Sequence, residues 1–195
     1  MVTARDIVII SIHSWEIEGG SNIKDIALEF SKHNRVLFVE RPLDRKSKLL
    51  NKNTKTVQRI LDIRQGKQPG LVKKKENLWV FQPDIIVESI NWIGTKFLHR
   101  FFNRKNNLRL AKSILKTMNK LDFNDVIVFN DGEMILGFFL DKYINPDLYI
   151  YYIRDNLIVN PYWKKHGKYL EPELIKKADL VVSNSVWYAD YAKTY

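Results

Sequence analysis

The 195-residue chain contains no cysteine, which excludes disulfide bridges, thiolate metal sites and a cysteine nucleophile. It also lacks a secretory signal, because the segment from Met1 to Ile12 holds only one strand-length apolar run, Ile7–Ile10. No stretch of the sequence approaches the length of a membrane span. These absences lead us to expect a cytoplasmic protein that folds around an ordinary hydrophobic core.

Several signature motifs are missing as well. The chain has no G-x-G-x-x-G dinucleotide fingerprint, no P-loop and no G-x-S-x-G nucleophile elbow. The four histidines show no metal-ligand spacing, and the nearest match to an Asp-x-Asp metal clamp is Asp131-Gly-Glu133. The usual serine hydrolase and metal-dependent chemistry are therefore disfavoured, and we expect neither a metal nor a resident cofactor.

Positive charge is abundant but unevenly placed. Residues 41–75 hold twelve lysines and arginines against two acidic residues, and residues 96–120 hold eight against none. The rest of the chain is mildly acidic, although the net charge is +10. Two such basic segments indicate an anionic partner, either a membrane surface or a nucleic acid, with a solvated face as the plain alternative.

Short apolar, β-branched runs alternate with helical patterns along the chain. Runs of this kind are typical of parallel strands that are buried on both faces. We expect strands at 6–12, 35–40, 78–82, 125–131, 148–153 and 180–183, and helices at 22–33, 56–64, 95–120, 133–143, 171–178 and 186–195. The order predicts a doubly wound, Rossmann-like α/β fold with a parallel sheet and flanking helices. No linker divides the chain, so residues 1–195 are expected to form one domain.

Polar residues follow five of the predicted strands at the point where each strand ends. In an open parallel sheet, ligands bind beyond these carboxyl ends, although strand ends are also polar because they meet water. The candidate binding residues are His13, Trp15, Arg41, Asp131, Arg154, Asp155, Asn156 and Ser185, together with Gly19, Gly20 and Ser21 before the first helix. The glycine pair lets backbone amides approach a phosphate, or forms an ordinary turn.

Residue chemistry suggests roles for some of these candidates. A carboxylate at Asp155 can orient a hydroxyl or take its proton, but a salt bridge to Arg154 explains it equally well. Arg41 and Arg154 can pair with phosphate. Trp15 can stack on a sugar or simply pack.

Two segments carry a more specific signal, and they resemble a known family. The segments Arg35-Val-Leu-Phe-Val-Glu-Arg-Pro42 and Ala178-Asp-Leu-Val-Val-Ser-Asn-Ser185 resemble strands of family 4 glycosyltransferases, which have the GT-B fold. The opening run from Asp6 to Trp15 and the run Tyr151-Tyr-Ile-Arg-Asp-Asn156 fit the same pattern, closest to the branch that makes teichuronic acid and capsule polysaccharide. The resemblance covers both ends of the chain and is poor across the basic middle.

The resemblance implies a retaining, metal-independent enzyme that transfers a sugar from a nucleotide-sugar to a glycan or lipid-linked acceptor in cell-surface polysaccharide synthesis. Such enzymes have two Rossmann-like domains, and this chain resembles the N-terminal, acceptor-binding one. The donor-binding domain is not in this sequence, so we expect the chain alone to be inactive. By the same resemblance, Gly19 and Gly20 lie near the donor phosphates, and Asp131 and Asp155 line the acceptor side as catalytic candidates. Many members carry a histidine where this chain has Arg154-Asp155.

The basic segment around 44–64 acquires a specific role under this interpretation. A basic amphipathic stretch holds a protein on anionic lipid at the inner face of the cell membrane. The predicted membrane contacts are Lys46, Lys48, Leu49, Leu50, Lys52, Lys55, Arg59 and Arg64, with Ile60 and Leu61 as further insertion points. The alternative is a basic α/β domain that binds nucleic acid or serves as a non-catalytic interaction module, although no recognition helix, zinc finger or RNP motif is present.

Overall fold

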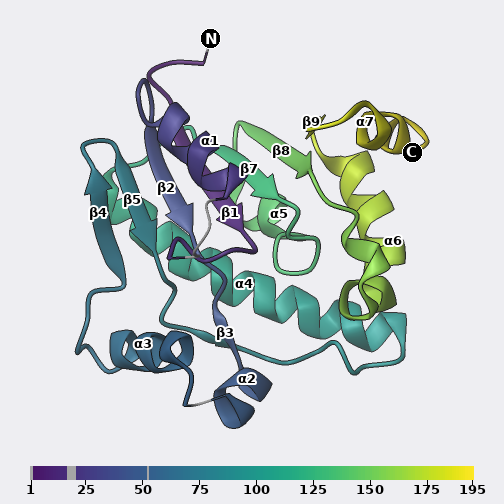
Figure 1. The fold of residues 1–195 in the computed structure, drawn as a ribbon, viewed down its shortest axis with the longest axis horizontal. Coiled ribbons are helices and arrows are strands. Elements are labelled where there is room, and N and C mark those ends of the chain that lie inside the picture. The colour runs from purple at the N-terminus through teal and green to yellow at the C-terminus, as the bar shows by residue number, and fades with distance from the viewer. Residues whose placement is uncertain (1, 17–20, 52) are drawn as a thin grey trace.

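The protein forms a mostly parallel β-sheet covered by helices, as a computed structural model of residues 2–16, 21–51 and 53–195 shows (Figure 1). The strands of the main sheet are β1 (Asp6–Ser11), β2 (Arg35–Val39), β4 (Leu71–Lys75), β5 (Leu78–Phe81), β7 (Ile127–Asp131), β8 (Leu148–Ile153) and β9 (Leu180–Ser183). The short strands β3 (Leu43–Asp44) and β6 (Ile86–Val87) pair with each other in a separate parallel ribbon.

The helices are α1 (Asn22–Phe30), α2 (Arg45–Leu50), α3 (Lys55–Arg64), α4 (Lys96–Leu121), α5 (Leu140–Ile144), α6 (Pro161–Lys177) and α7 (Val186–Lys193), with a 3-10 turn at Leu157–Val159. None of the helices within the described residues combines the length and the apolar composition that crossing a membrane requires.

The strand order identifies the architecture. The sheet runs β4-β5-β2-β1-β7-β8-β9, and every pair is parallel except the edge pair β4-β5. Without β4, this order is that of a doubly wound Rossmann-like sheet, in which the chain winds outward from the central strand in both directions. The predicted fold class is therefore confirmed. Strands β1 and β7 are neighbours, and the direction in which the chain adds strands reverses between them. Their carboxyl ends therefore form the topological switch point.

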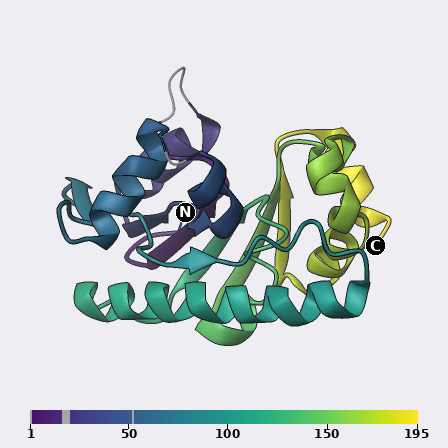
Figure 2. The same cartoon turned by 90° about the horizontal axis from the view of Figure 1, so that it is seen from below.

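Alternate residues of the central strands face two different cores, which is why these strands are apolar throughout. Val8 and Ile10 of β1 pack in the core that α4, α5 and α6 cover. Ile7 and Ile9 point the other way, into the core that α1 covers. Figure 2 shows α4 extending along one side of the sheet. Because both faces are sealed by helices, polar chemistry is confined to the strand ends.

The six predicted strands and the long basic helix are present within a few residues of their expected positions, but other segments differ, and α2, β3 and β6 were not predicted. The sequence pattern does not predict β4, an edge strand whose lysines discourage pairing with further strands. Residues 134–139 form turns instead of the start of the predicted 133–143 helix, and only Leu140–Ile144 is helical. Here the Glu133 carboxylate accepts hydrogen bonds from the amides of Ile135 and Leu136, which competes with helix formation.

The predicted 171–178 helix is much longer than expected, since α6 begins at Pro161. Proline is favourable at the first helical position, and the Asn160 side chain caps the helix by accepting from the amide of Tyr162. The helix continues through Gly167 and Pro172, two residues that ordinarily interrupt a helical pattern. Packing explains the glycine: a methyl group there would lie 2.7 Å from the sulfur of Met134.

Gly137 offers a test of how tightly the turn after β7 is packed. A methyl group on this buried glycine would collide with the carbonyl oxygen of Glu133 and the side chain of Asn130. We expect Gly137→Ala to lower the free energy of unfolding by about 2 kcal/mol, measured by chemical denaturation. Gly94→Ala is the matched control, because nothing lies within 4 Å of its added methyl group, and it should change stability by less than about 0.5 kcal/mol. Equal effects of the two substitutions would show that the turn is not tightly packed.

Candidate functional site

The carboxyl ends of β1, β7 and β8 bring together a buried polar cluster at the switch point. Asp131 is the last residue of β7 and is fully buried. Its carboxylate accepts hydrogen bonds from Nε of Arg154, at 2.8 Å, and from Oγ of Ser11, at 3.2 Å. These three residues come from adjacent strand ends, as the parallel register requires, because Ser11 pairs with Asp131 across the ladder.

Burial controls the protonation of this cluster. Removal from water raises the pKa of Asp131 to about 6, although Arg154 and the Ser11 hydroxyl favour the charged form. Burial and the positive charge of Arg154 lower the pKa of His13, against the opposing effect of Asp155. The cluster therefore combines a carboxyl group whose pKa is raised to about 6 with an imidazole whose pKa is lowered.

A second network joins the loop after β1 to the end of β2. The buried carboxylate of Glu40 accepts hydrogen bonds from the Ser14 hydroxyl at 2.6 Å and from the Trp15 amide at 2.7 Å. Its other oxygen accepts from Nη2 of Arg59, on α3, at 2.7 Å. Trp15 itself packs edge-on against Phe38, with ring centroids 5.1 Å apart. Glu40 thus holds the loop that precedes the glycine pair, and Trp15 belongs to the hydrophobic packing.

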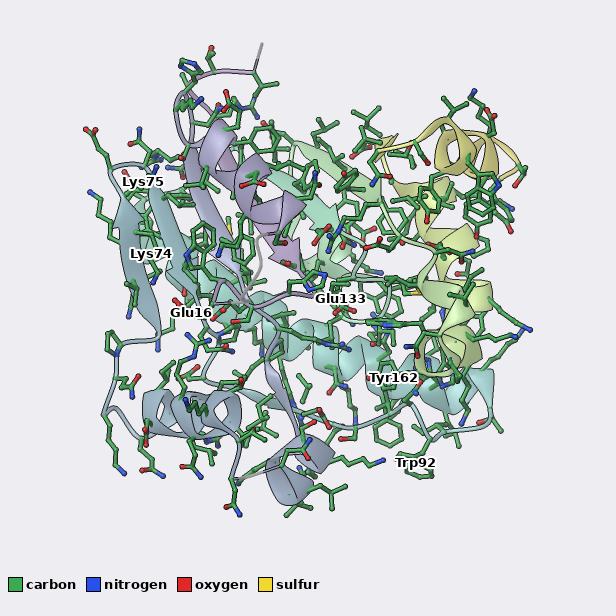
Figure 3. The ribbon with its side chains drawn as sticks, viewed as in Figure 1. Glu16, Lys74, Lys75, Trp92, Glu133 and Tyr162 are labelled. Carbon is green, nitrogen blue, oxygen red and sulfur yellow. The ribbon has the colours of Figure 1, made fainter. Side chains whose placement is uncertain are left out.

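A third buried carboxylate belongs to Glu133, which follows β7. Nε of Arg41 lies 3.3 Å from Oε2 of Glu133. The guanidinium group of Arg41 also lies over the ring of Trp163, 5.0 Å from its centroid. Glu133 points into the middle of the molecule, while Tyr162 lies towards α2 (Figure 3). Arg41 therefore connects the end of β2 to the turn after β7 and to the start of α6.

A cavity of about 760 Å³, lined by both polar and apolar side chains, opens beyond the end of β2. Its walls come from the segment containing β3 and α2, from the loop after β6, from the turn after β7 and from the start of α6. The basic and aromatic residues that line it are Arg41, Lys46, Trp92, Tyr162 and Lys165. Asn91 also lines it, and its buried side-chain oxygen has no hydrogen-bond partner within the described part of the chain.

The structure gathers some predicted site residues and separates others. Asp155 lies beside the switch-point cluster, with its carboxylate 3.7 Å from Nε of Arg154, and its side chain is 57% exposed. Asn156 precedes the 3-10 turn. The hydroxyl of Ser185 caps α7 by accepting from the Tyr188 amide, which is a structural role. Ser21 stands at the N-cap of α1 without a side-chain capping bond. Gly19 and Gly20 lie outside the described residues.

The predicted membrane contacts within the described residues lie on two helices, α2 and α3. Lys46, Lys48, Leu49 and Leu50 lie on α2, and both leucines are largely exposed. Lys55 and Arg64 mark the two ends of α3. Lys52 lies outside the described residues.

Two of the expectations for α3 need correction. Ile60, expected to insert into lipid, packs in a small buried cluster with Leu43 and Val57, and Leu61 packs against that cluster. Arg59 pairs with Glu40 inside the protein at 2.7 Å. Amphipathicity alone cannot tell a helix face that packs on its own domain from one that contacts a membrane.

Sequence reasoning missed the two buried carboxylates of Glu40 and Glu133 as organisers of this edge, and it missed Trp92. The signal for Glu40 was present, because it follows the apolar strand β2 directly, whereas Glu133 lies two residues beyond the end of β7. Trp92 gave no signal, since it stands alone in an irregular segment after β6.

The described residues also contain a buried histidine pair that the spacing of histidines did not suggest. The rings of His99, on α4, and His166, on α6, stack with centroids 3.5 Å apart. Nδ1 of His166 lies 3.1 Å from the hydroxyl of Tyr169, which in turn lies 2.8 Å from Nδ1 of His99. Nε2 of His166 lies 3.2 Å from the carbonyl oxygen of Asn91, in the loop that lines the cavity.

The carbonyl of Asn91 fixes the protons along this chain of hydrogen bonds. A carbonyl only accepts, so Nε2 of neutral His166 carries the hydrogen and its Nδ1 accepts from the hydroxyl of Tyr169. That hydroxyl then accepts from Nδ1 of His99, whose Nε2 is left as a buried acceptor without a partner among the described residues. Burial, with the nearby His166 and Lys165, lowers the pKa of His99 to about 3, and burial lowers the pKa of His166. Both rings are therefore neutral at physiological pH.

No protein-family model matches the chain, and a search of curated proteins finds no match. Function is therefore argued from the geometry and chemistry of the strand ends and the cavity.

The pairing of Asp131 with Arg154 predicts a pH-dependent cost of removing the arginine. Arg154→Met leaves the buried carboxylate without its cation, and we expect this to lower the free energy of unfolding by about 3 kcal/mol at about pH 8. Because the carboxyl already has a raised pKa, it takes up a proton as the pH falls, and the loss should shrink at about pH 5. Urea denaturation at both pH values measures the difference.

The double variant Asp131→Asn/Arg154→Met is the control for this experiment. It removes both charges, so it should be more stable than Arg154→Met at about pH 8. A loss from Arg154→Met that stays constant with pH would contradict the assignment of a buried, ionisable Asp131.

The histidine pair predicts a second pH effect with a defined sign. The pKa of folded His99 lies below the unfolded value of about 6.5, so the stability due to this residue is complete above that pH and falls as the pH drops towards about 3. His99→Phe removes the effect. The difference in unfolding free energy between the wild type and this variant should therefore decrease by about 1.4 kcal/mol for each pH unit below about 6.5. A difference that does not change with pH would refute the neutral, buried state of His99.

Proposed function

We propose that the chain is the acceptor-binding domain of a metal-independent glycosyltransferase of the GT-B type, which receives a sugar from a nucleotide-sugar bound by another domain. The observation that carries the proposal is the cavity beyond the carboxyl end of β2 of a Rossmann-like sheet, whose lining includes Ile135 and Leu136 of the turn after β7. This edge is where open α/β sheets bind their ligands. The resemblance of the β2 and β9 segments to family 4 glycosyltransferases points to the same chemistry.

The groups that line the cavity fit a sugar that carries an anionic group. Trp92 and Tyr162 provide aromatic faces against which the apolar side of a pyranose ring can pack. Lys46 and Lys165 add positive charge for a phosphate or a carboxylate. An acceptor of this class is a phosphorylated or uronic-acid sugar, either free or linked to a lipid, as cell-surface polysaccharides contain.

The switch-point cluster supplies the chemical groups of the proposal. Asp155 is the exposed carboxylate, and it is suited to orient the attacking hydroxyl of an acceptor or to take its proton. Asp131 is buried, so it acts through Arg154, which it holds in place at the end of β8. Arg154 is then a positive group beside the reacting centre, where the leaving phosphate of a donor gains negative charge.

Glycosyl transfer requires an acceptor hydroxyl and an anomeric carbon in reacting geometry, with water excluded. The proposal assigns the binding of the donor, which carries the anomeric carbon, to a separate domain. We therefore expect this chain to bind an acceptor without transferring sugar by itself.

Lys46 and Lys48 provide a matched pair of variants for testing acceptor binding. Both lie on α2, but only Lys46 lines the cavity. Saturation-transfer NMR with N-acetylglucosamine 1-phosphate and with glucuronic acid should detect binding of at least one of these probes to the full chain. Lys46→Met should weaken that binding about tenfold, because one charge-assisted contact is lost, while Lys48→Met should leave it unchanged.

Two results would overturn the proposal. One is that neither probe binds at millimolar concentration. The other is that a single-stranded oligonucleotide binds more tightly than either probe at the same salt concentration, with equal losses from the two lysine variants. Such a result would favour the nucleic-acid alternative, because phosphate-backbone contacts depend on the number of basic residues and not on their place in a cavity.

A further inference from the structure

Two consecutive residues of α6 fasten the loop after β6, which forms one wall of the cavity. Nε2 of His166 donates to the carbonyl oxygen of Asn91 at 3.2 Å, and Nζ of Lys165 donates to the carbonyl oxygen of Trp92 at 2.8 Å. Asn91, Trp92 and Lys165 all line the cavity. Figure 3 shows Trp92 on the same side of the molecule as Tyr162, at the beginning of α6. The position of this wall therefore depends on how α6 is held.

The histidine pair holds the beginning of α6 against the beginning of α4. His99 is completely buried, and His166 is 2% exposed. Their rings stack almost parallel, at an angle of 13°, and the hydroxyl of Tyr169 bridges the two Nδ1 atoms. Figures 1 and 2 both show these two helix ends side by side. We call His99, His166 and Tyr169 the histidine latch.

The latch has no suitable place for an additional proton. A proton on Nδ1 of His166 would point at the Tyr169 hydroxyl, which already accepts from His99 and has no other hydrogen-bond partner within the described residues. A proton on Nε2 of His99 would lie on a buried nitrogen that likewise has no partner in the described part of the chain. Each position would bury a hydrogen-bond donor or a charge without compensation.

The charged groups around the latch also oppose protonation. Lys165 of α6 acts on both imidazoles, and Lys96 of α4 lies over the ring of Tyr169, 5.2 Å from its centroid. Arg100 of α4 and Glu173 of α6 act on Tyr169, but they pair with each other at 2.9 Å. The loop from residue 89 to residue 95 contains no titratable side chain. Two cationic rings stacked 3.5 Å apart would in addition repel each other strongly.

We propose that the histidine latch is an acid-sensitive switch, which holds the loop after β6 in place while both rings are neutral and releases it when they are protonated. The loop is the segment able to move alone, because residues 88–95 form no helix or strand and β6 pairs with β3 over only two residues. Segments with so few backbone contacts open at a lower free energy than the core. The central strands and the later turns of α4 stay folded.

The sign of the pH dependence follows from linkage. Burial lowers the pKa of both histidines, so the packed latch binds a proton more weakly than an open one, in which the rings meet water. Packing is therefore fully favoured above the unfolded value of about 6.5 and is lost as the pH falls. His99 alone raises the opening constant about tenfold for each pH unit below about 6.5.

Release of the loop would regulate the same cavity that we assign to the acceptor. Asn91 and Trp92 would leave its wall, so a ligand held there would dissociate in acid. This consequence rests on the proposed function. The release itself does not, because it can be observed without any sugar.

Hydrogen–deuterium exchange of the full chain, followed by mass spectrometry, tests the release. Labelling times are scaled at each pH to the intrinsic exchange rate, so that only changes in protection remain. Between about pH 7.5 and about pH 5.5, residues 86–99 and 161–170 should lose protection about tenfold or more, while β1 and β7 keep theirs. A structural histidine pair without a switching role would lose protection only together with the whole domain.

A double variant separates the latch from other effects of acid. His99→Gln/His166→Gln keeps a donor and an acceptor at both positions but removes both titrating groups, so the protection of the two segments should no longer depend on pH. His33→Gln is the matched control, because it replaces an exposed histidine that precedes β2, and it should keep the full response. Histidine side-chain nitrogen NMR of the wild type should show His166 protonated at Nε2 only, with both buried rings neutral at about pH 7.

The proposal is overturned if protection of residues 86–99 does not change with pH, if β1 and β7 lose protection equally, or if the double variant responds like the wild type. A charged His99 or His166 in the folded wild type at about pH 7 would also overturn it, even if the double variant does not fold. Because no sugar is present, release of the loop without sugar binding would refute only the acceptor site, and sugar binding without release would refute only the switch.

Discussion

The parallel pairing of β1 with β7 is the interaction on which the rest of the molecule depends. It joins two halves of the sheet that wind outward in opposite directions, so the loops after β1 and β7 leave a crevice between them. Both faces of these strands are buried under helices, and polar side chains are therefore excluded from the strand interiors. Ser11 and Asp131 are the last residues of β1 and β7, and the register places them opposite each other.

Three buried carboxylates then organise this edge of the sheet, each with an arginine from a different part of the chain. Asp131 holds Arg154 of the segment after β8, Glu40 holds Arg59 of α3, and Glu133 holds Arg41 at the end of β2. A buried carboxylate without a partner is costly, so each pair constrains the position of its loop. The pairs supply rigidity to the strand ends, while Asp155 and the lining of the cavity remain available to a ligand.

Much of the sheet could be predicted from sequence, because strands buried on both faces leave an unmistakable pattern of β-branched and apolar residues. The same rule placed Asp131 and Arg154 at adjoining strand ends. It could not predict which residue pairs with Glu40. Arg59 is nineteen positions away in the chain, and the pattern of its helix is equally typical of a membrane contact. The stacked pair of His99 and His166 depends on how α4 crosses α6, which local periodicity does not encode.

The cavity suggests a use for part of the positive charge in the middle of this chain. Lys46 of α2 lines it together with Arg41. Residues 41–75 interrupt the regular alternation of strands and helices, and residues 41–51 of this segment form one wall of the cavity. Residues 41–75 add a surface to the sheet, and the order of its parallel strands is that of a doubly wound sheet.

Chemical-shift mapping of the isotopically labelled chain tests the central claim most directly. Titration with N-acetylglucosamine 1-phosphate or glucuronic acid should shift the backbone amides of residues 41–51, 88–92 and 131–136, which line the cavity and the switch point, and leave those of α7 and β4 unchanged. Shifts confined to α7 or β4, or no shifts at saturating sugar, would contradict a sugar site at the carboxyl ends of the strands.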